Sequence, residues 1–321
     1  MPAKSSLNPD ALDLLLGQAN LRKRMNRLKR DDVTLAFQEV GSGALPILLV
    51  HGWACDHSFL APQLAFFGRA HRSVAVDLRG HGMSDAPEQN YTMAGFADDL
   101  AWLCAQINLE RPVVIGHSMG GNVALELAAR YPELPTAIAL IDSVILPSRD
   151  FIEALQPLAK ALKGLHYLSA LEQASSLLLL PTDSAERKSQ LLASAAKTPQ
   201  HVIASAFSNH VTEYDATAAI KACCVPIAYI GAAAPIGDVN RFRKICPNLI
   251  TGQTIGSGHL SPLEVPDQIN PMLERFVEVY AAKGENRPSA SPNRDEQTRV
   301  AASAESRALQ TRMNPHFCSM L

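Results

Sequence analysis

A serine that could act as a nucleophile stands between two glycines near the middle of the chain. Segment 116–120 reads Gly-His-Ser-Met-Gly, follows a strand-like run at 111–115 and precedes a helix-forming stretch at 122–130. A strand that turns sharply into a helix strains the residue at the turn, so small neighbours are needed on both sides. The N-terminus of the following helix also favours negative charge. This pattern, a nucleophile elbow, predicts that the Ser118 hydroxyl attacks an electrophilic carbon.

A histidine framed by glycines follows the last predicted strand, at 249–255. Segment 256–260 reads Gly-Ser-Gly-His-Leu, and glycines let a loop carry an imidazole toward a distant serine. No other histidine lies so late in the part of the chain that is predicted to fold. We therefore expect His259 to take the proton of the Ser118 hydroxyl as a general base.

Two backbone N–H groups are candidates for binding the negative oxygen that such an attack creates. A buried strand is predicted at 45–50, and residues 51–53 at its end read His-Gly-Trp, where a loop can donate a backbone N–H group. The residue after an elbow nucleophile supplies the second donor. We expect this oxyanion hole to be formed by Trp53 and Met119.

A third motif completes an ordered set. A short strand predicted at 73–76 is followed by Asp-Leu-Arg-Gly-His-Gly-Met-Ser at 77–84. Taken in order, the three motifs resemble those of the α/β-hydrolase family, over about residues 33–280. The resemblance implies an α/β fold with a mostly parallel eight-stranded sheet, helices on both faces and a helical cap. It also implies a triad in the chain order serine, acid, histidine.

The acid of that triad is where the chain departs from the family. Most members carry aspartate three residues after the glycine that ends strand seven, but residues 231–235 here read Gly-Ala-Ala-Ala-Pro. Ala234 occupies the acid position and cannot orient an imidazole. Asp142 is one substitute: it ends the predicted strand 137–141, and a carboxylate at that strand end is the triad acid in the haloalkane dehalogenases.

Asp238 is the alternative acid, because it lies in the loop after strand seven. It also directly precedes a helix start at 239–244, where aspartate is a preferred N-cap residue. Only a short stretch separates it from His259, which leaves little chain for the last strand. We favour Asp142 over Asp238, and a dyad without any acid is the remaining alternative.

The nucleophile narrows the reaction types. Haloalkane dehalogenases and epoxide hydrolases of this fold use a carboxylate at the elbow, so Ser118 argues against both. Serine with an oxyanion hole indicates acyl transfer, and we expect cleavage of a carboxylic ester or lactone. The alternatives are a C–C bond hydrolase, a cofactor-free perhydrolase and a catalytically silent protein that binds a ligand. No cofactor or metal is expected, since the six cysteines lack metal-ligand spacing.

Composition limits the partners. The chain carries 29 basic and 31 acidic residues, a net charge of −2, which does not favour a nucleic-acid surface. Scattered cysteines are typical of reduced thiols, and no segment is apolar for long enough to span a bilayer. We expect a cytoplasmic protein that acts on a small apolar ester-like substrate, and the oligomeric state stays open.

Changes in pattern divide the chain into four parts. Residues 1–32 form an N-terminal extension with a basic amphipathic helix expected at 11–30. Residues 33–146 and 222–283 form the core. Leucine- and alanine-rich helical segments at 151–162, 171–180 and 185–197 predict a cap over 147–221, with leucines that either face the site or form the cap's own core. Residues 284–321 have the composition of a disordered tail.

Overall fold

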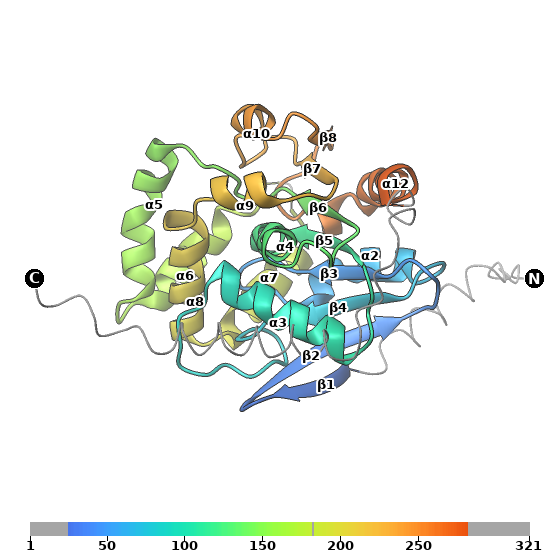
Figure 1. Cartoon of the computed structure of the whole chain (residues 1–321). Coiled ribbons are helices and arrows are strands. Elements are labelled where there is room, and N and C mark those ends of the chain that lie inside the picture. The colour runs from blue at the N-terminus through green and yellow to red at the C-terminus, as the bar shows by residue number, and fades with distance from the viewer. Residues whose placement is uncertain (1–24, 182, 282–321) are drawn as a thin grey trace, which may run out of the picture.

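An eight-stranded sheet forms the centre of the molecule, as the sequence predicts (Figure 1). The computed structural model describes residues 25–181 and 183–281. The strand order is β1-β2-β4-β3-β5-β6-β7-β8, with β1 and β2 antiparallel to their neighbours and the other pairs parallel. The strands are β1 (Met25–Arg30), β2 (Val33–Val40), β3 (Ile47–Val50), β4 (Ser73–Asp77), β5 (Val113–His117), β6 (Ala137–Ile141), β7 (Ile227–Gly231) and β8 (Ile250–Gln253).

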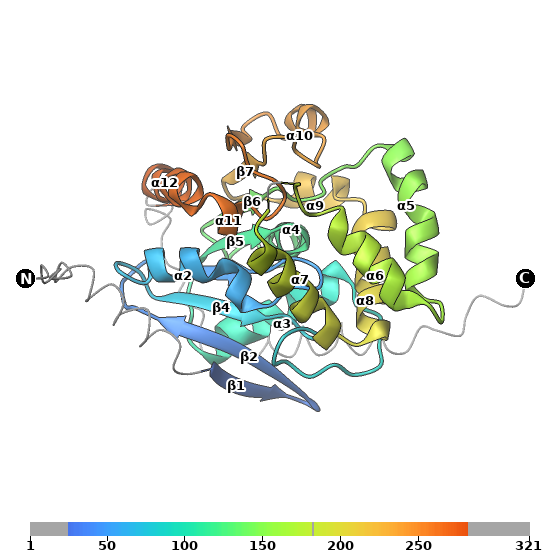
Figure 2. The ribbon, with the colours of Figure 1, turned by 180° about the vertical axis from the view of Figure 1, so that it is seen from behind.

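The parallel strands are covered on both faces, which is why they read as short apolar runs. Figure 1 shows α3, α4 and α9 in front of the sheet, and Figure 2 shows α2, α11 and α12 on the opposite face. Successive side chains of β3 alternate accordingly: Leu48 packs with the first group of helices and Leu49 with α2 and α12. The helices outside the cap are η1 (His57–Leu60), α2 (Ala61–Phe67), α3 (Met93–Gln106), α4 (Met119–Arg130), α9 (Thr217–Ala222), α10 (Val239–Ile245), α11 (Ser261–Glu264), α12 (Pro266–Phe276) and η3 (Val277–Ala281).

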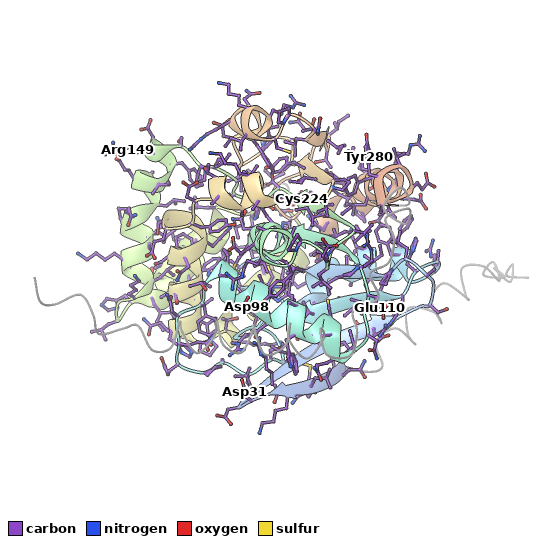
Figure 3. The ribbon with its side chains drawn as sticks, viewed as in Figure 1. Asp31, Asp98, Glu110, Arg149, Cys224 and Tyr280 are labelled. Carbon is purple, nitrogen blue, oxygen red and sulfur yellow. The ribbon has the colours of Figure 1, made fainter. Side chains whose placement is uncertain are left out.

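The helix expected at 11–30 is wrong over its last six residues. Met25–Arg30 is strand β1, paired along its whole length with β2. The hairpin turns at Asp31, whose φ is +52° and which lies at the edge of the molecule in Figure 3. Arg30 is buried and donates to Asp99 on α3 at 2.9 Å. Strand pairing and this ion pair therefore override the helical spacing of the apolar residues, and residues 11–24 lie outside the described part of the chain.

Helices without an intervening strand connect β6 to α9 within residues 147–221, where the cap is expected; α9 itself packs on α4 with the core helices, although most of it falls inside the expected cap. The cap helices lie together on one side of the sheet in Figure 1. The second one begins four residues earlier than expected and ends before the leucine run 177–180, which leads into Pro181, a residue that disfavours helix before it. The cap helices are α5 (Arg149–Leu162), α6 (Tyr167–Ser176), α7 (Ala185–Lys197), α8 (Gln200–Phe207) and the π-helix η2 (Ser208–Thr212).

The cap leucines do not share one environment. Leu162 is fully buried in the large core, whereas Leu165 is 98% exposed and Leu168 and Leu177 are largely exposed. Leu178 and Leu179 pack in a small cluster with Phe59, Leu191 and Leu260. The leucines therefore divide between positions packed in clusters that the cap shares with the core and positions on the outer surface.

Two further expectations concern the ends and the membrane. The tail predicted at 284–321 lies outside the described residues. Within the described ranges, no helix is both long and apolar enough to cross a membrane.

Candidate active site

Ser118 lies at a strained turn between β5 and α4. Its φ of +53° is a region that non-glycine residues rarely adopt. The flanking glycines are required by space: a Cβ atom at Gly116 would lie 2.1 Å from the Gly120 carbonyl oxygen, and one at Gly120 would lie 2.1 Å from the Val50 carbonyl oxygen. The strand, turn and helix expected of a nucleophile elbow are therefore present.

His259 connects Ser118 to Asp142 by two hydrogen bonds. Its Nε2 lies 2.9 Å from Ser118 Oγ, and its Nδ1 lies 2.8 Å from Asp142 Oδ2. All three side chains are buried, His259 being 8% exposed and Asp142 fully enclosed. Because a carboxylate accepts hydrogen bonds, we assign the proton of the neutral ring to Nδ1, which leaves Nε2 free to accept from the serine hydroxyl.

Asp142 is held by the backbone of the neighbouring strand. It follows β6 with a φ of +42°, and its N–H group donates to the Ile230 carbonyl oxygen at 2.8 Å. Its second carboxylate oxygen, Oδ1, accepts from the Ala232 N–H group at 3.1 Å. One oxygen is thus fixed by the loop after β7, and the other is aimed at His259.

Asp238 performs a different task. Its Oδ1 accepts from the Arg241 N–H group at 2.9 Å, so it caps the N-terminus of α10. The side chain is exposed, as is Ala234 in the position where most family members carry the acid. The structure brings Ser118, His259 and Asp142 together and leaves Asp238 out of the group.

His117 supports the loop that carries His259, a role that the sequence did not reveal. His117 Nε2 lies 2.7 Å from the His259 carbonyl oxygen, and the two rings are 4.9 Å apart between centroids. Burial, helped by the nearby His259, lowers the pKa of His117 to about 3, so its ring is neutral at pH 7. A neutral ring can donate Nε2–H to that carbonyl without adding positive charge beside His259.

The two residues expected to form the oxyanion hole lie beside the elbow. Met119 is the first residue of α4, so its N–H group has no acceptor within the helix. Trp53 follows Gly52, where a Cβ atom would lie 3.1 Å from Ser118 Cβ. The Trp53 ring is fixed by a hydrogen bond from Nε1 to the Ile203 carbonyl oxygen in the cap. This placement is compatible with two convergent donors.

A second histidine, His51, fixes the loop that carries Gly52 and Trp53. Its Nε2 accepts from the Leu78 N–H group at 3.0 Å, and its Nδ1 lies 2.8 Å from the Gly52 carbonyl oxygen. Burial lowers the pKa of His51, which keeps one nitrogen available as an acceptor. His51 therefore ties the end of β3 to the segment after β4.

One group of described side chains has a spacing that a metal ion could bridge, namely Asp56, His57 and Asp77, whose ligand atoms lie within 4.8 Å of one another. These atoms already serve protein hydrogen bonds. Asp77 Oδ1 accepts from His57 N and lies 2.8 Å from His57 Nδ1, and an Asp56 oxygen caps η1 at Ser58. These side chains therefore hold the start of η1 against the end of β4, and we assign no metal to them.

The connected serine, imidazole and carboxylate can transfer a proton in a defined direction. His259 Nε2 can accept the Ser118 proton as the oxygen attacks a carbonyl, and Asp142 can stabilise the resulting imidazolium. The N-terminus of α4 points positive potential at the same place. The arrangement suits acyl transfer to Ser118.

Comparison with known proteins agrees with the fold. The family model described as alpha/beta hydrolase fold matches residues 46–166. A 2-(acetamidomethylene)succinate hydrolase of Mesorhizobium japonicum is 33% identical over 124 residues, which cover 39% of this chain and 44% of that protein. A bifunctional esterase/perhydrolase of Acinetobacter calcoaceticus is 32% identical over 120 residues, covering 37% and 44%.

A solved structure extends the likeness beyond the matched segment. The thermophilic esterase from Thermogutta terrifontis has a TM-score of 0.70 and 24% identity, over 79% of this chain and 98% of that one. By sequence, the chain spans less than half the length of the two curated relatives named above. The sheet order, the elbow and these matches together show that the chain has the α/β-hydrolase fold.

Proposed function

We propose that this protein is a serine hydrolase that cleaves a carboxylic ester or lactone through an acyl-enzyme on Ser118. The observation that carries the proposal is the hydrogen-bonded sequence from Ser118 Oγ through His259 to Asp142, with bonds of 2.9 and 2.8 Å. The hydrolase and esterase names of the two curated relatives support the same class.

The proposed reaction has two halves. Ser118 Oγ attacks the substrate carbonyl carbon while its proton passes to His259 Nε2, and the resulting oxyanion accepts hydrogen bonds from the Trp53 and Met119 N–H groups. The intermediate collapses, the carbon–oxygen bond to the alcohol breaks, and the alcohol takes the proton from His259. A water molecule then attacks the acyl-enzyme carbonyl while His259 takes its proton. The bond from that carbon to Ser118 Oγ breaks, Ser118 Oγ takes the proton back from His259, and the carboxylic acid is released.

The surroundings of the serine favour an uncharged substrate. Neutral His117 borders the site, and the ring of Phe207 packs against Trp53 with 5.1 Å between centroids. Leu180 lies over the loop that carries His259, since a Cβ atom at Gly258 would lie 2.7 Å from Leu180 Cγ. A charged acyl chain would lose hydration against such groups, so we expect medium-length uncharged esters to react best.

Perhydrolysis is the second candidate activity. A perhydrolase replaces water by hydrogen peroxide in the second half of the same cycle, and one curated relative is named as both an esterase and a perhydrolase. It needs the same acyl-enzyme, so it extends the proposal. A C–C hydrolase and a silent ligand-binding protein are the expectations with less support.

Labelling with a fluorophosphonate tests the proposal, because this reagent reacts with a serine that is activated by a base. We expect one adduct, located at Ser118 by peptide mass mapping, together with hydrolysis of p-nitrophenyl butyrate. Ser118→Ala should lose both properties. Ser175→Ala is the matched control, because Ser175 is also a buried serine but lies in α6. Labelling elsewhere, or activity that survives in Ser118→Ala, would contradict the proposal.

A further inference from the structure

A buried histidine in the cap has no hydrogen-bond partner within the described part of the protein. His210, in η2, is 3% exposed, and both of its ring nitrogens are enclosed without a donor or acceptor. Buried polar atoms are almost always paired, and an unpaired one costs stability. A group kept unpaired in the folded protein therefore calls for an explanation outside the protein's own contacts.

The cap segment that carries His210 is anchored over the elbow. Helix α8 runs directly into η2, and its Ile203 carbonyl oxygen accepts the Trp53 Nε1–H bond at 3.0 Å. Phe207, the last residue of α8, contacts the Trp53 ring. The neighbouring Asn209 is tied to Asn90 at 2.7 Å. These contacts fix η2 from two sides and leave two of its buried side chains without a partner, the His210 ring and the Ser208 hydroxyl.

His210 follows Phe207 by three residues, so it lies in the turn of the cap next to the contact between Phe207 and the Trp53 ring. Burial lowers the pKa of His210 to about 3, and the nearby His259 and His117 contribute to this shift in the same direction. The ring is therefore neutral at pH 7 and offers one N–H donor and one acceptor nitrogen. A π-helical turn such as η2 is uncommon and occurs often at functional sites.

The other described histidines beside the elbow are engaged. His259 bonds Asp142 and Ser118, His117 bonds the His259 carbonyl oxygen, and His51 bonds Leu78 and Gly52. Each of these three rings is oriented by the protein itself. His210 differs because neither nitrogen is used, so its hydrogen-bonding capacity remains available to a bound molecule.

We propose that His210 binds an uncharged hydrogen-bonding group of the substrate, such as a hydroxyl, beside the carbonyl that Ser118 attacks. The inference rests on the proposed function and names the substrate class more closely: esters or lactones with a polar, uncharged substituent near the scissile bond. A hydroxyl suits this site because it can either accept from the protonated imidazole nitrogen or donate to the unprotonated one. His210 thus determines specificity and takes no part in the proton transfer.

Matched ester pairs test this inference. One pair is p-nitrophenyl butyrate and its 3-hydroxy derivative, and the other is ethyl butyrate and 2-hydroxyethyl butyrate. We expect the wild type to prefer the hydroxylated member of at least one pair by kcat/KM. His210→Phe keeps a buried ring but removes both nitrogens, and it should lower this preference roughly tenfold, the effect of losing one substrate hydrogen bond. His210→Gln, which keeps a donor and an acceptor, should retain part of it.

Two controls separate the possible failures. His201→Phe changes a neighbouring half-buried histidine of α8 that contacts Ala86 and Glu88 instead, and it should leave the preference unchanged. Fluorophosphonate labelling of Ser118 should persist in every His210 variant. Labelling can persist while the wild type shows no preference for the hydroxylated ester, or while His210→Phe retains that preference. Either result would show that the proposed role of His210 is wrong and would leave the proposed hydrolase activity intact. If the wild type neither labels nor hydrolyses any ester, both proposals fail.

The melting temperature gives a readout that does not depend on activity. If substrate is the missing partner, the protein without substrate holds an unpaired buried imidazole, and His210→Phe should melt at the same temperature or higher. A marked fall in melting temperature would show that the ring is already satisfied in the folded protein, for example by an internal water molecule, and would overturn the inference.

Discussion

The ends of β6 and β7 lie side by side in the sheet but carry opposite kinds of residue. At the end of β6, Asp142 is fully buried, strained in its backbone and directed at His259. In the loop after β7, Ala234 and Asp238 are exposed, and Asp238 caps a helix. The carboxylate that contacts His259 thus follows β6, whereas the loop after β7 has alanine at the position where the family resemblance implies the acid.

The loop after β7 also contacts the residues of the candidate site through its backbone. Its Ala232 N–H group donates to Asp142 Oδ1, and its Ala233 N–H group donates to the Ser257 carbonyl oxygen in the histidine loop. The loop after β7 therefore holds the Asp142 carboxylate and the loop that carries His259 through two backbone N–H groups.

The largest expected effect belongs to Asp142→Asn. The amide keeps the shape but can present N–H to His259, which favours the unproductive tautomer of the ring, so we expect kcat for ester hydrolysis to fall on the order of 10⁴-fold. Steady-state kinetics on p-nitrophenyl butyrate measure it. A fall in kcat of less than about tenfold would mean that another residue orients His259, and would contradict the contrast drawn between the ends of β6 and β7.

Removing the carboxylate altogether should add a cost in stability. In Asp142→Asn the new amide oxygen could still accept the Ala232 N–H bond, whereas Asp142→Ala leaves this buried N–H group unpaired. We expect Asp142→Ala to be less stable than Asp142→Asn by about 1–3 kcal/mol. Urea unfolding of the two variants measures the difference in the free energy of unfolding. Equal values would show that the hydrogen bond from the Ala232 N–H group to residue 142 does not contribute to stability.

The buried end of β5, beside β6, should also make the protein sensitive to acid. His117 has a pKa of about 3 when folded, against 6.5 for the ordinary side chain. Between these values the unfolded chain binds the extra proton, so the stability present above pH 6.5 is lost as the pH falls toward 3. His117→Gln should flatten this slope by about 1.4 kcal/mol per pH unit.

Urea unfolding at pH values of about 4.5, 5.5 and 6.5, which span the window between the two pKa values, checks the slope. The exposed His166 supplies the matched control as His166→Gln. An unchanged slope in His117→Gln would mean that the His117 ring takes up its proton in the folded protein, contrary to its burial.

The smallest effect is expected in the β7 loop. Asp238→Ala removes the cap of α10 and should cost about 1 kcal/mol of stability, with kcat within a few fold of the wild type once the protein is folded. Thermal unfolding and the same ester assay measure both quantities. A large fall in kcat with unchanged stability would reverse the roles of the two strand ends.

Motifs made the sheet and the elbow predictable, because their residues are adjacent in sequence. The glycines around Ser118 are needed for local backbone reasons, and a loop histidine after the last strand is a local pattern as well. The acid could not be chosen in this way. The sequence favoured Asp142, because Asp238 directly precedes a helix start, but the contact with His259 is visible only in the positions of the two carboxylates in space.

Tertiary contacts explain what the sequence did not show. The residues of β1 have helical spacing, yet they pair with β2, and Arg30 meets Asp99 from a distant helix. In the sequence, nothing distinguishes His117 from other residues next to the nucleophile motif, or His210 from other residues of the cap. Their significance comes from burial and from which nitrogens find partners, and neither property has a sequence signal of its own.

The tautomer of His259 tests the central claim most directly, since the claim is that Asp142 and no β7 residue orients this ring. Nitrogen NMR of protein labelled with ¹⁵N-histidine at neutral pH reports which nitrogen carries the proton. We predict Nδ1–H in the wild type and in Asp238→Ala, and a shift toward Nε2–H in Asp142→Asn. An unchanged Nδ1–H ring in Asp142→Asn, or a change in Asp238→Ala, would contradict the assignment of Asp142.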